Sequence, residues 1–177
     1  RQWLIIGIGF LLIVGATLLL YIPRLYYPFV FDDLGSIVQN PFIRELWPVT
    51  RAMDSTNQNP LAGRPISSYS LAMSYAASGL SPWAYRLMTL GIHFINVLLI
   101  IGILRRALRG LPGMMPTLAA VLIAGIWSIH PLNVDSLVYV TQRTEVLVSM
   151  FMLLTLWLAI RGFESPRPMS WLLGSVA

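Results

Sequence analysis

The sequence predicts an all-α integral membrane protein. Of its 177 residues, 56% are hydrophobic and only 11% are charged, and the mean hydropathy is +0.72. Because soluble domains carry about 25% charged residues, this deficit of charge excludes an ordinary soluble domain. Long apolar runs also alternate with arginine-bearing segments, which is typical of membrane-spanning helices joined by polar connections.

The first expected span covers residues 3–22, a nearly uninterrupted apolar run that stops at Pro23. About 20 such residues suffice to cross the roughly 30 Å hydrocarbon core of a bilayer. A cleaved signal peptide is the alternative, but the run is long for one and no small-x-small cleavage site follows it, so a retained helix is favoured. Further spans are expected over residues 86–104, 114–130, 137–161 and 169–177, and the last of these predicts that the chain is a piece of a longer protein.

Residues 23–85 are too polar to span a membrane and too long for a simple turn. Breaks at prolines and at the "GRP" tripeptide predict short helices over residues 37–49 and 67–78. In the second helix Tyr69, Met73 and Ala76 recur at helical spacing, which predicts a helix that lies along the membrane surface. We therefore expect about four or five spans and one long outer loop that carries short interfacial helices.

Arginine-bearing segments indicate how the spans are oriented, because cytoplasmic connections are enriched in basic residues. The spans put three such segments on one side, and these carry Arg1, Arg105, Arg106, Arg109, Arg161 and Arg167. We therefore expect a cytoplasmic N-terminus, with loop 23–85 and the "HPLNVDS" turn on the periplasmic side of a bacterial inner membrane. The net charge of +5 reflects these flanking arginines, and no groove of basic and aromatic residues predicts a nucleic-acid partner.

The motifs of the common soluble enzymes are missing from the sequence. It contains no P-loop, GxSxG or HExxH motif, and it has no cysteine for a disulfide or a thiolate. Its two histidines, His93 and His130, are too few to make a zinc site by themselves. No metal site or cofactor is therefore predicted, although use of a divalent metal is left open. Acid–base chemistry at the outer membrane face, with arginines nearby, is what remains.

Two adjacent carboxylates, Asp32 and Asp33, follow the first span in "FVFDDLGSIVQNP". Neighbouring side chains in one loop rarely point at the same atom, so we expect them to have different roles. Asp33 precedes "LGSIV" and is a candidate helix N-cap, which leaves Asp32 slightly preferred as a catalytic base. The alternative is that both residues belong to a solvated turn or cap.

Arg143 is a candidate for binding a phosphate group, since a guanidinium fork matches phosphate geometry. A helix that starts near residue 133 would align Asp135, Tyr139 and Arg143 on one stripe. Glu145 would then point to nearly the opposite side. The alternative for Arg143 is an interfacial contact with lipid headgroups.

Four other polar residues have a structural interpretation, and two of them, Arg64 and His130, also have a functional one. Arg64 in "GRP" is either a second phosphate contact or a loop anchor. His130, at the end of the third expected span, is either a site residue or a hydrogen-bonded structural residue. His93 and Asn96 lie inside the second expected span, where polar side chains are expected to hydrogen-bond neighbouring helices.

Three blocks of the sequence, taken in order, resemble a known family. They are "FVFDD-x-x-x-IVQNP", "GRPISSYSLAMSYAASGLSPWAYR" and "IHPLNVDSLVYVTQRTEVLVSMF". Together they resemble the N-terminal membrane region of the transmembrane and tetratricopeptide-repeat O-mannosyltransferases and their bacterial relatives, which are GT-C glycosyltransferases. The resemblance extends from Tyr27 to Arg161, which is most of the chain.

This resemblance implies a GT-C-like helical bundle that transfers a sugar, such as mannose, from a polyprenyl phosphate to a protein hydroxyl with inversion. It implies that Asp32 or Asp33 is the base in the first outer loop. Arg64, His130 and Arg143 fall in the other motif blocks, where we expect phosphate-binding or positioning roles. The partners expected from the family are membrane lipid, the lipid-linked sugar and an acceptor protein.

The sequence also departs from the family pattern at several supporting positions. Arg86 and Thr89 replace the first His and the Asn of the block "Y/F-H-x-x-N-x-x-x-H", in which only His93 matches. Asp135 stands where Glu is more usual, and Glu145 completes the R-x-E block. These departures keep open a catalytically inactive GT-C-like accessory subunit that packs against a larger membrane complex. A small transporter is a weaker alternative, since transport favours ionisable groups at mid-membrane and the expected spans are nearly free of charge.

Overall fold

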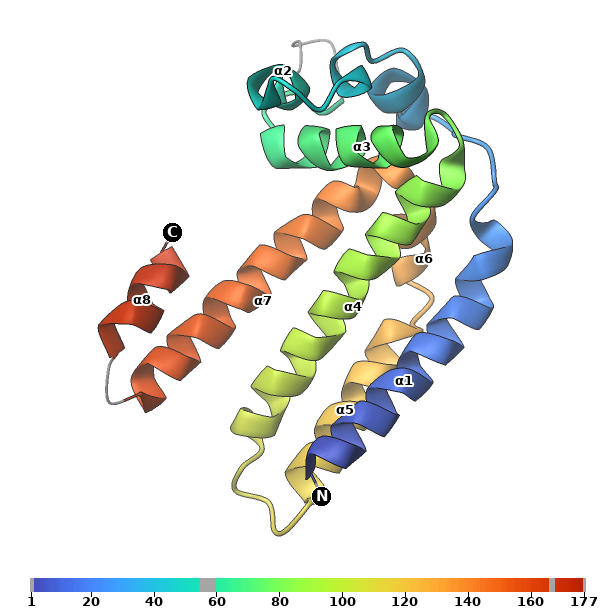
Figure 1. Cartoon of the computed structure of the whole chain (residues 1–177). Helices are drawn as coiled ribbons and strands as arrows, with labels where there is room; N and C mark the ends of the chain where they lie inside the picture. The colour runs from blue at the N-terminus through green and yellow to red at the C-terminus, as the bar shows by residue number, and fades with distance from the viewer. Residues whose placement is uncertain (1, 55–59, 166–167, 177) are drawn as a thin grey trace. The chain divides into compact units, whose positions relative to one another are not determined.

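A computed structural model describes residues 2–54, 60–165 and 168–176 (Figure 1). Every regular element in these ranges is helical, as the sequence predicts. The α-helices are α1 (Gln2–Tyr21), α2 (Val49–Met53), α3 (Pro65–Ser78), α4 (Pro82–Ala107), α5 (Met115–Ser128), α6 (Asn133–Val138), α7 (Arg143–Glu164) and α8 (Pro168–Val176). Arg1, Arg167 and the last residue of the expected span 169–177 lie outside the described residues.

Three stretches of the described chain are long and apolar enough to cross a membrane, as expected of an integral membrane protein. They are Gln2–Arg24, Pro82–Ala107 and Val140–Glu164. Each corresponds to one of the expected spans. The other two expected spans correspond to shorter helices, since α5 has 14 residues and α8 has nine.

The chain divides into two compact units. The first unit comprises Arg1–Leu19, Ile92–Pro131 and Val148–Ala177, and the second comprises Leu20–Gly91 and Leu132–Leu147. The range of the second unit therefore includes the long loop, residues 23–85, together with the segment that follows "HP". The arginine-bearing connections belong to the first unit.

The first unit is held together by a small apolar core with close helix contacts. Its buried members are Ile13, Val97, Ile101, Ala120 and Ala124. A Cβ atom at Gly9 would collide with Val121, so the absence of a side chain there is what lets α1 approach α5. Small residues serve the same purpose at many helix contacts in membranes.

A buried polar chain also links helices of the first unit. His93 Nε2 lies 3.0 Å from Ser128 Oγ, which in turn lies 3.1 Å from Thr17 Oγ1. The His93 ring stacks on Trp127, with 5.0 Å between the ring centroids. This confirms the expectation that His93 hydrogen-bonds a neighbouring helix, and hydrogen bonding is what permits polar side chains at such buried positions.

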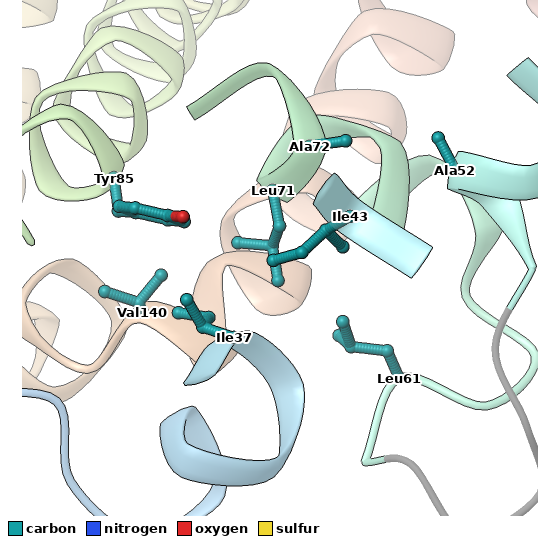
Figure 2. Close-up of a cluster of buried hydrophobic side chains, with 8 residues drawn as sticks. All are labelled: Ile37, Ile43, Ala52, Leu61, Leu71, Ala72, Tyr85 and Val140. Carbon is teal, nitrogen blue, oxygen red and sulfur yellow. The ribbon is translucent and has the colours of Figure 1, made fainter. Parts of the chain in front are cut away.

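The second unit has a core built by the long loop and α3. Its buried residues are Ile37, Ile43, Ala52, Leu61, Leu71, Ala72, Tyr85 and Val140. Figure 2 shows Ile43 and Leu71 pointing toward one another. In Figure 1, α2 lies beside α3, onto which it packs. The described part of the long loop is thus folded, because its apolar residues are buried in this core.

The helix predicted over residues 67–78 is confirmed by α3, which ends at Gly79 with a positive φ of 59°. The continuous helix predicted over residues 37–49 is wrong. That segment forms a π-helical turn (Leu34–Val38), a 3-10 turn (Phe42–Arg44) and then the short helix α2. Asn40 accounts for the break, since its side chain donates to the Ser36 carbonyl and accepts from the Phe42 amide, both at 3.0 Å. Such side-chain bonds compete with the helix ladder.

Candidate functional site

The two adjacent carboxylates lie at a strained turn in the second unit. Phe31, the residue before them, has a φ of 50°, which is unusual for a residue other than glycine. The Asp33 amide donates to the Val30 carbonyl at 3.0 Å and closes the turn. As a result Asp33 is completely buried, whereas Asp32 is exposed. This confirms the expectation that the two side chains have different surroundings.

The Asp33 carboxylate binds the chain on the far side of the "HP" segment. Its Oδ1 accepts hydrogen bonds from the Thr141 amide at 2.8 Å and from the Thr141 hydroxyl at 2.7 Å, and its Oδ2 accepts from the Val140 amide at 3.4 Å. These amides open the 3-10 turn Val140–Gln142. Burial raises the pKa of Asp33, while the bonds from Thr141 and Val140 oppose that rise.

Asp33 is therefore a cap, but of a different element from the one expected. The prediction that its side chain caps "LGSIV" is wrong, because no side-chain cap bond is made at Leu34–Val38. Asp33 has φ −60° and ψ −30°, a helical conformation. Residues that cap their own helix usually adopt extended angles, which bring the side chain back over the first amides.

The same bonds interrupt the helix predicted through residues 133–143. Helix α6 ends at Val138, and Tyr139 is extended with a ψ of 108° before α7 begins at Arg143. The Val140 and Thr141 amides bond Asp33 instead of continuing the helix. The prediction that Asp135, Tyr139 and Arg143 share one helical stripe is therefore wrong.

Tyr139 instead contacts the turn that carries Asp32. The Asp32 amide donates to the Tyr139 hydroxyl at 3.0 Å. The Tyr139 ring also meets the Phe31 ring edge-on, with centroids 6.3 Å apart. Burial raises the pKa of Tyr139 above its ordinary value of 10.0. These contacts fix the backbone of Asp32, which is an exposed residue.

A cavity of about 360 Å³ lies beside this contact. It is lined by Tyr27, Pro28, Val30, Phe31, Arg86, Val134, Asp135, Val138 and Tyr139. Its walls are mostly apolar, with one cation, one carboxylate and two phenols among them. Small-molecule sites commonly have this composition and a volume of roughly 300–1,000 Å³.

Arg86 organises the wall of this cavity. Its guanidinium donates to the carbonyls of Val138 at 2.8 Å, Leu25 at 3.0 Å and Pro28 at 3.2 Å, and also to that of Tyr27. The side chain is almost fully buried. Arg86 thus ties the start of the long loop to the end of α6.

Arg143, predicted to contact phosphate, is buried within the second unit. Its Nε donates to Thr89 Oγ1 at 3.0 Å, its Nη1 to the Ser70 carbonyl at 2.9 Å and its Nη2 to the Tyr85 carbonyl at 2.6 Å. A buried cation needs such bonds to replace its lost hydration. A phosphate contact by Arg143 would require several of these bonds to be given up.

The remaining predicted residues lie in several places. Arg64, before α3, and Glu145, in the first turn of α7, are exposed residues of the second unit. His130 is an exposed residue of the first unit, to which buried His93 also belongs. In the described ranges no group of three or more His, Asp or Glu side chains is placed to hold a metal ion.

The structure thus places Arg86 and Asp135 on one cavity and Asp32 beside it. Three further residues define this site: Phe31, Tyr139 and Thr141. Tyr139 was singled out in the sequence only for a helical stripe that does not form. Nothing in the sequence predicts the positive φ of Phe31. The role of Thr141 could not be predicted either, because its contact with Asp33 joins residues far apart in the sequence.

Comparison with known proteins agrees with the resemblance carried by the three sequence blocks. Over 80% of this chain and 16% of its own length, protein O-mannosyl-transferase TMTC3 of Homo sapiens is 23% identical. Protein O-mannosyl-transferase F38B6.6 of Caenorhabditis elegans is 24% identical over 87% of this chain and 23% of its own length. Protein O-mannosyl-transferase TMTC2 of Mus musculus is 27% identical over 89% of this chain and 20% of its own length.

The similarity therefore extends over most of this chain but over about a fifth of each curated relative. No protein-family model matches the chain. No solved structure matches it either. The chain is thus similar at low identity to proteins named as O-mannosyltransferases.

Proposed function

We propose that the chain is part of a membrane glycosyltransferase that moves a sugar from a polyprenyl phosphate to a protein hydroxyl. The observation that carries this proposal is the exposed Asp32, held by Tyr139 beside a cavity that contains Arg86 and Asp135. The names of the relatives make mannose the first sugar to test.

In this proposal Asp32 is the general base. The acceptor hydroxyl gives its proton to the Asp32 carboxylate while its oxygen forms a bond to the anomeric carbon of the sugar. The bond from that carbon to the phosphate oxygen breaks, and the polyprenyl phosphate departs with the electron pair. Attack from the face opposite the phosphate inverts the anomeric centre.

The departing phosphate needs cationic or donor groups near it. Arg64 is the exposed arginine of the second unit predicted for this role. Arg86 lies on the cavity wall, but its guanidinium already donates to four carbonyls. We therefore assign Arg86 the task of shaping the cavity and Arg64 that of binding phosphate.

The proposal includes the membrane arrangement predicted from the sequence. It places loop 23–85 on the outer, periplasmic face of a bacterial inner membrane and the arginine-bearing connections in the cytoplasm. It counts α5 and α8 as parts of further spans in a GT-C-like bundle. The exposed face of α3, which carries Met73 and Ala76, then lies along the membrane surface.

Transfer by the full-length protein in proteoliposomes tests this function. We expect a labelled acceptor peptide to gain mannose when polyprenyl-phosphate mannose is supplied, and to gain none when only a nucleotide sugar is supplied. Omitting the acceptor peptide is the control for donor hydrolysis. Transfer from the nucleotide sugar alone, or the absence of transfer from every polyprenyl-phosphate sugar, would contradict the proposal.

A catalytically inactive accessory subunit is the second candidate function. It is favoured by Arg86, which replaces a family histidine and is fully engaged with backbone carbonyls. On this alternative the full-length protein transfers no sugar with any lipid-linked donor. It would instead co-purify stoichiometrically with other membrane subunits that depend on it for assembly.

A further inference from the structure

A second cavity, of about 490 Å³, lies in the first unit among the arginines that follow the spans. It is lined by Trp3, Arg105, Arg106, Arg109, Trp157, Arg161 and Glu164. Four arginines thus share this cavity with a single carboxylate. The proposed glycosyltransferase site uses none of these residues.

Glu164 neutralises only part of this charge. It accepts from Arg106 Nε at 3.2 Å and from Arg109 Nη1 at 2.8 Å. Arg105 Nη2 donates to the neutral Gln2 side chain at 3.1 Å. Arg161 forms no salt bridge in the described part of the chain. The lining therefore retains an excess of positive charge that an anion would offset.

The side chain of Arg161 is held in an aromatic frame. Its guanidinium carbon lies 5.0 Å from the centre of the Trp171 ring and 5.9 Å from that of Trp157. Its Nε is buried, and within the described residues it has no hydrogen-bond acceptor. A buried charged donor without an acceptor is costly, and an anionic oxygen in the cavity would satisfy it.

Orientation in the membrane does not account for this arrangement. The positive-inside tendency depends on how many arginines and lysines lie in a connection, and it makes no demand on where their side chains converge. Here arginines from the ends of α4 and α7 meet at one cavity. Arg105, Arg106 and Arg161 lie over the indole rings of Trp3, Trp157 and Trp171, respectively. Tryptophan is enriched where spans reach the headgroup level.

We propose that this cavity binds a phosphate group, either that of an anionic lipid or free inorganic phosphate. The guanidinium fork is suited to the paired oxygens of a phosphate. Basic pockets between membrane helices are recognised sites for anionic lipid headgroups. Glu164 repels the incoming anion and competes for Arg106 and Arg109, so it weakens binding.

Native mass spectrometry of the detergent-solubilised protein, with added lipid or phosphate, tests this site. The probes are dioleoyl phosphatidylglycerol, dioleoyl phosphatidylcholine and inorganic phosphate. The variants are Arg161→Gln and Glu164→Gln, and Arg51→Gln is the charge-matched control because Arg51 is an exposed, salt-bridged residue of the second unit. Circular dichroism of each variant shows that it remains folded.

We expect phosphatidylglycerol to bind more tightly than phosphatidylcholine. Loss of one charge-assisted contact in Arg161→Gln should weaken its binding about tenfold, while Glu164→Gln should strengthen it and Arg51→Gln should leave it unchanged. Competition by inorganic phosphate at similar concentrations would identify free phosphate as the ligand and would still support the site. Equal binding of the two lipids with no phosphate binding would overturn the proposal, as would unchanged binding in both Arg161→Gln and Glu164→Gln.

Discussion

The Asp33 carboxylate and Thr141, 108 positions apart in the sequence, are joined by two hydrogen bonds, one from the Thr141 amide and one from its hydroxyl. This contact fastens the turn after the first span to the segment before α7. It also holds the Asp33 carboxylate in a buried position, which is why we propose Asp32 as the base. Asp33 is committed to structure, and Asp32 is left exposed beside the cavity.

Thr141→Val tests the structural role of this contact. The substitution keeps the shape of the side chain but removes the hydroxyl donor from a buried carboxylate. We expect the free energy of unfolding to fall by about 1–3 kcal/mol, the cost of a lost buried hydrogen bond. A lower thermal midpoint in detergent would show this loss of stability. Thr155→Val, at an exposed position of α7, is the matched control. Equal midpoints for the two variants would contradict the role.

The pH dependence of stability tests the environment of Asp33. Burial raises its pKa above the ordinary value of 3.8. A carboxyl that binds its proton more tightly in the folded chain than in the unfolded chain stabilises the fold as the pH falls through the interval between the two pKa values. We therefore expect the wild type to gain stability relative to Asp33→Asn as the pH is lowered from about 7 to about 4.

Thermal midpoints of the two proteins across this pH range provide the measurement. Asp54→Asn, at an exposed position in the same loop, serves as the control and should track the wild type. A difference between wild type and Asp33→Asn that stays constant, or that shrinks as the pH falls, would show that the pKa of Asp33 is not raised.

Arg143→Lys tests whether Arg143 is a structural residue. Lysine keeps the charge but cannot donate at once to Thr89, Ser70 and Tyr85 from the positions of the guanidinium fork. We expect a loss of about 2–4 kcal/mol in the free energy of unfolding, since carbonyl and hydroxyl acceptors are left buried without donors. The exposed Arg51→Lys should lose less than about 1 kcal/mol. A stable Arg143→Lys protein with weakened donor binding would instead support a phosphate contact.

Tyr139→Phe tests the positioning of Asp32. The substitution removes the hydroxyl that accepts from the Asp32 amide and keeps the ring that packs on Phe31. We expect kcat for sugar transfer to fall several-fold, with KM for the donor and the thermal midpoint little changed. Tyr75→Phe, in α3, is the matched control. If kcat is unchanged, or if the thermal midpoint falls together with kcat, Tyr139 does not act by positioning Asp32.

The helices of the protein follow from sequence wherever one periodic signal dominates. Helices α1, α4 and α7 are long apolar runs, and α3 begins at the proline of "GRP" and ends at Gly79. Segment 37–49 was predicted wrongly because the competing signal is a side-chain bond of Asn40, whose strength depends on the conformation it helps to create.

The candidate site was only partly predictable, because its decisive contacts are distant in sequence. The two acids could be found from their position after the first span, and their surroundings differ, since Asp33 is buried and Asp32 is exposed. Which element Asp33 caps depends on where Thr141 lies in the fold. Local sequence around Asp33 does not specify the position of a residue 108 positions away. In the same way, Arg86 and Arg143 are both buried, yet only Arg86 lines the cavity.

The most direct test of the account is the rate of sugar transfer by Asp32→Asn in the full-length protein. A general base contributes about 10²- to 10⁴-fold to a rate, so we predict a fall in kcat of at least about 100-fold with an unchanged thermal midpoint. Asp33→Asn should lower the thermal midpoint, unlike Asp32→Asn. Asp54→Asn should match the wild type in both kcat and thermal midpoint. Transfer by Asp32→Asn at the wild-type rate would contradict the assignment of Asp32 as the base.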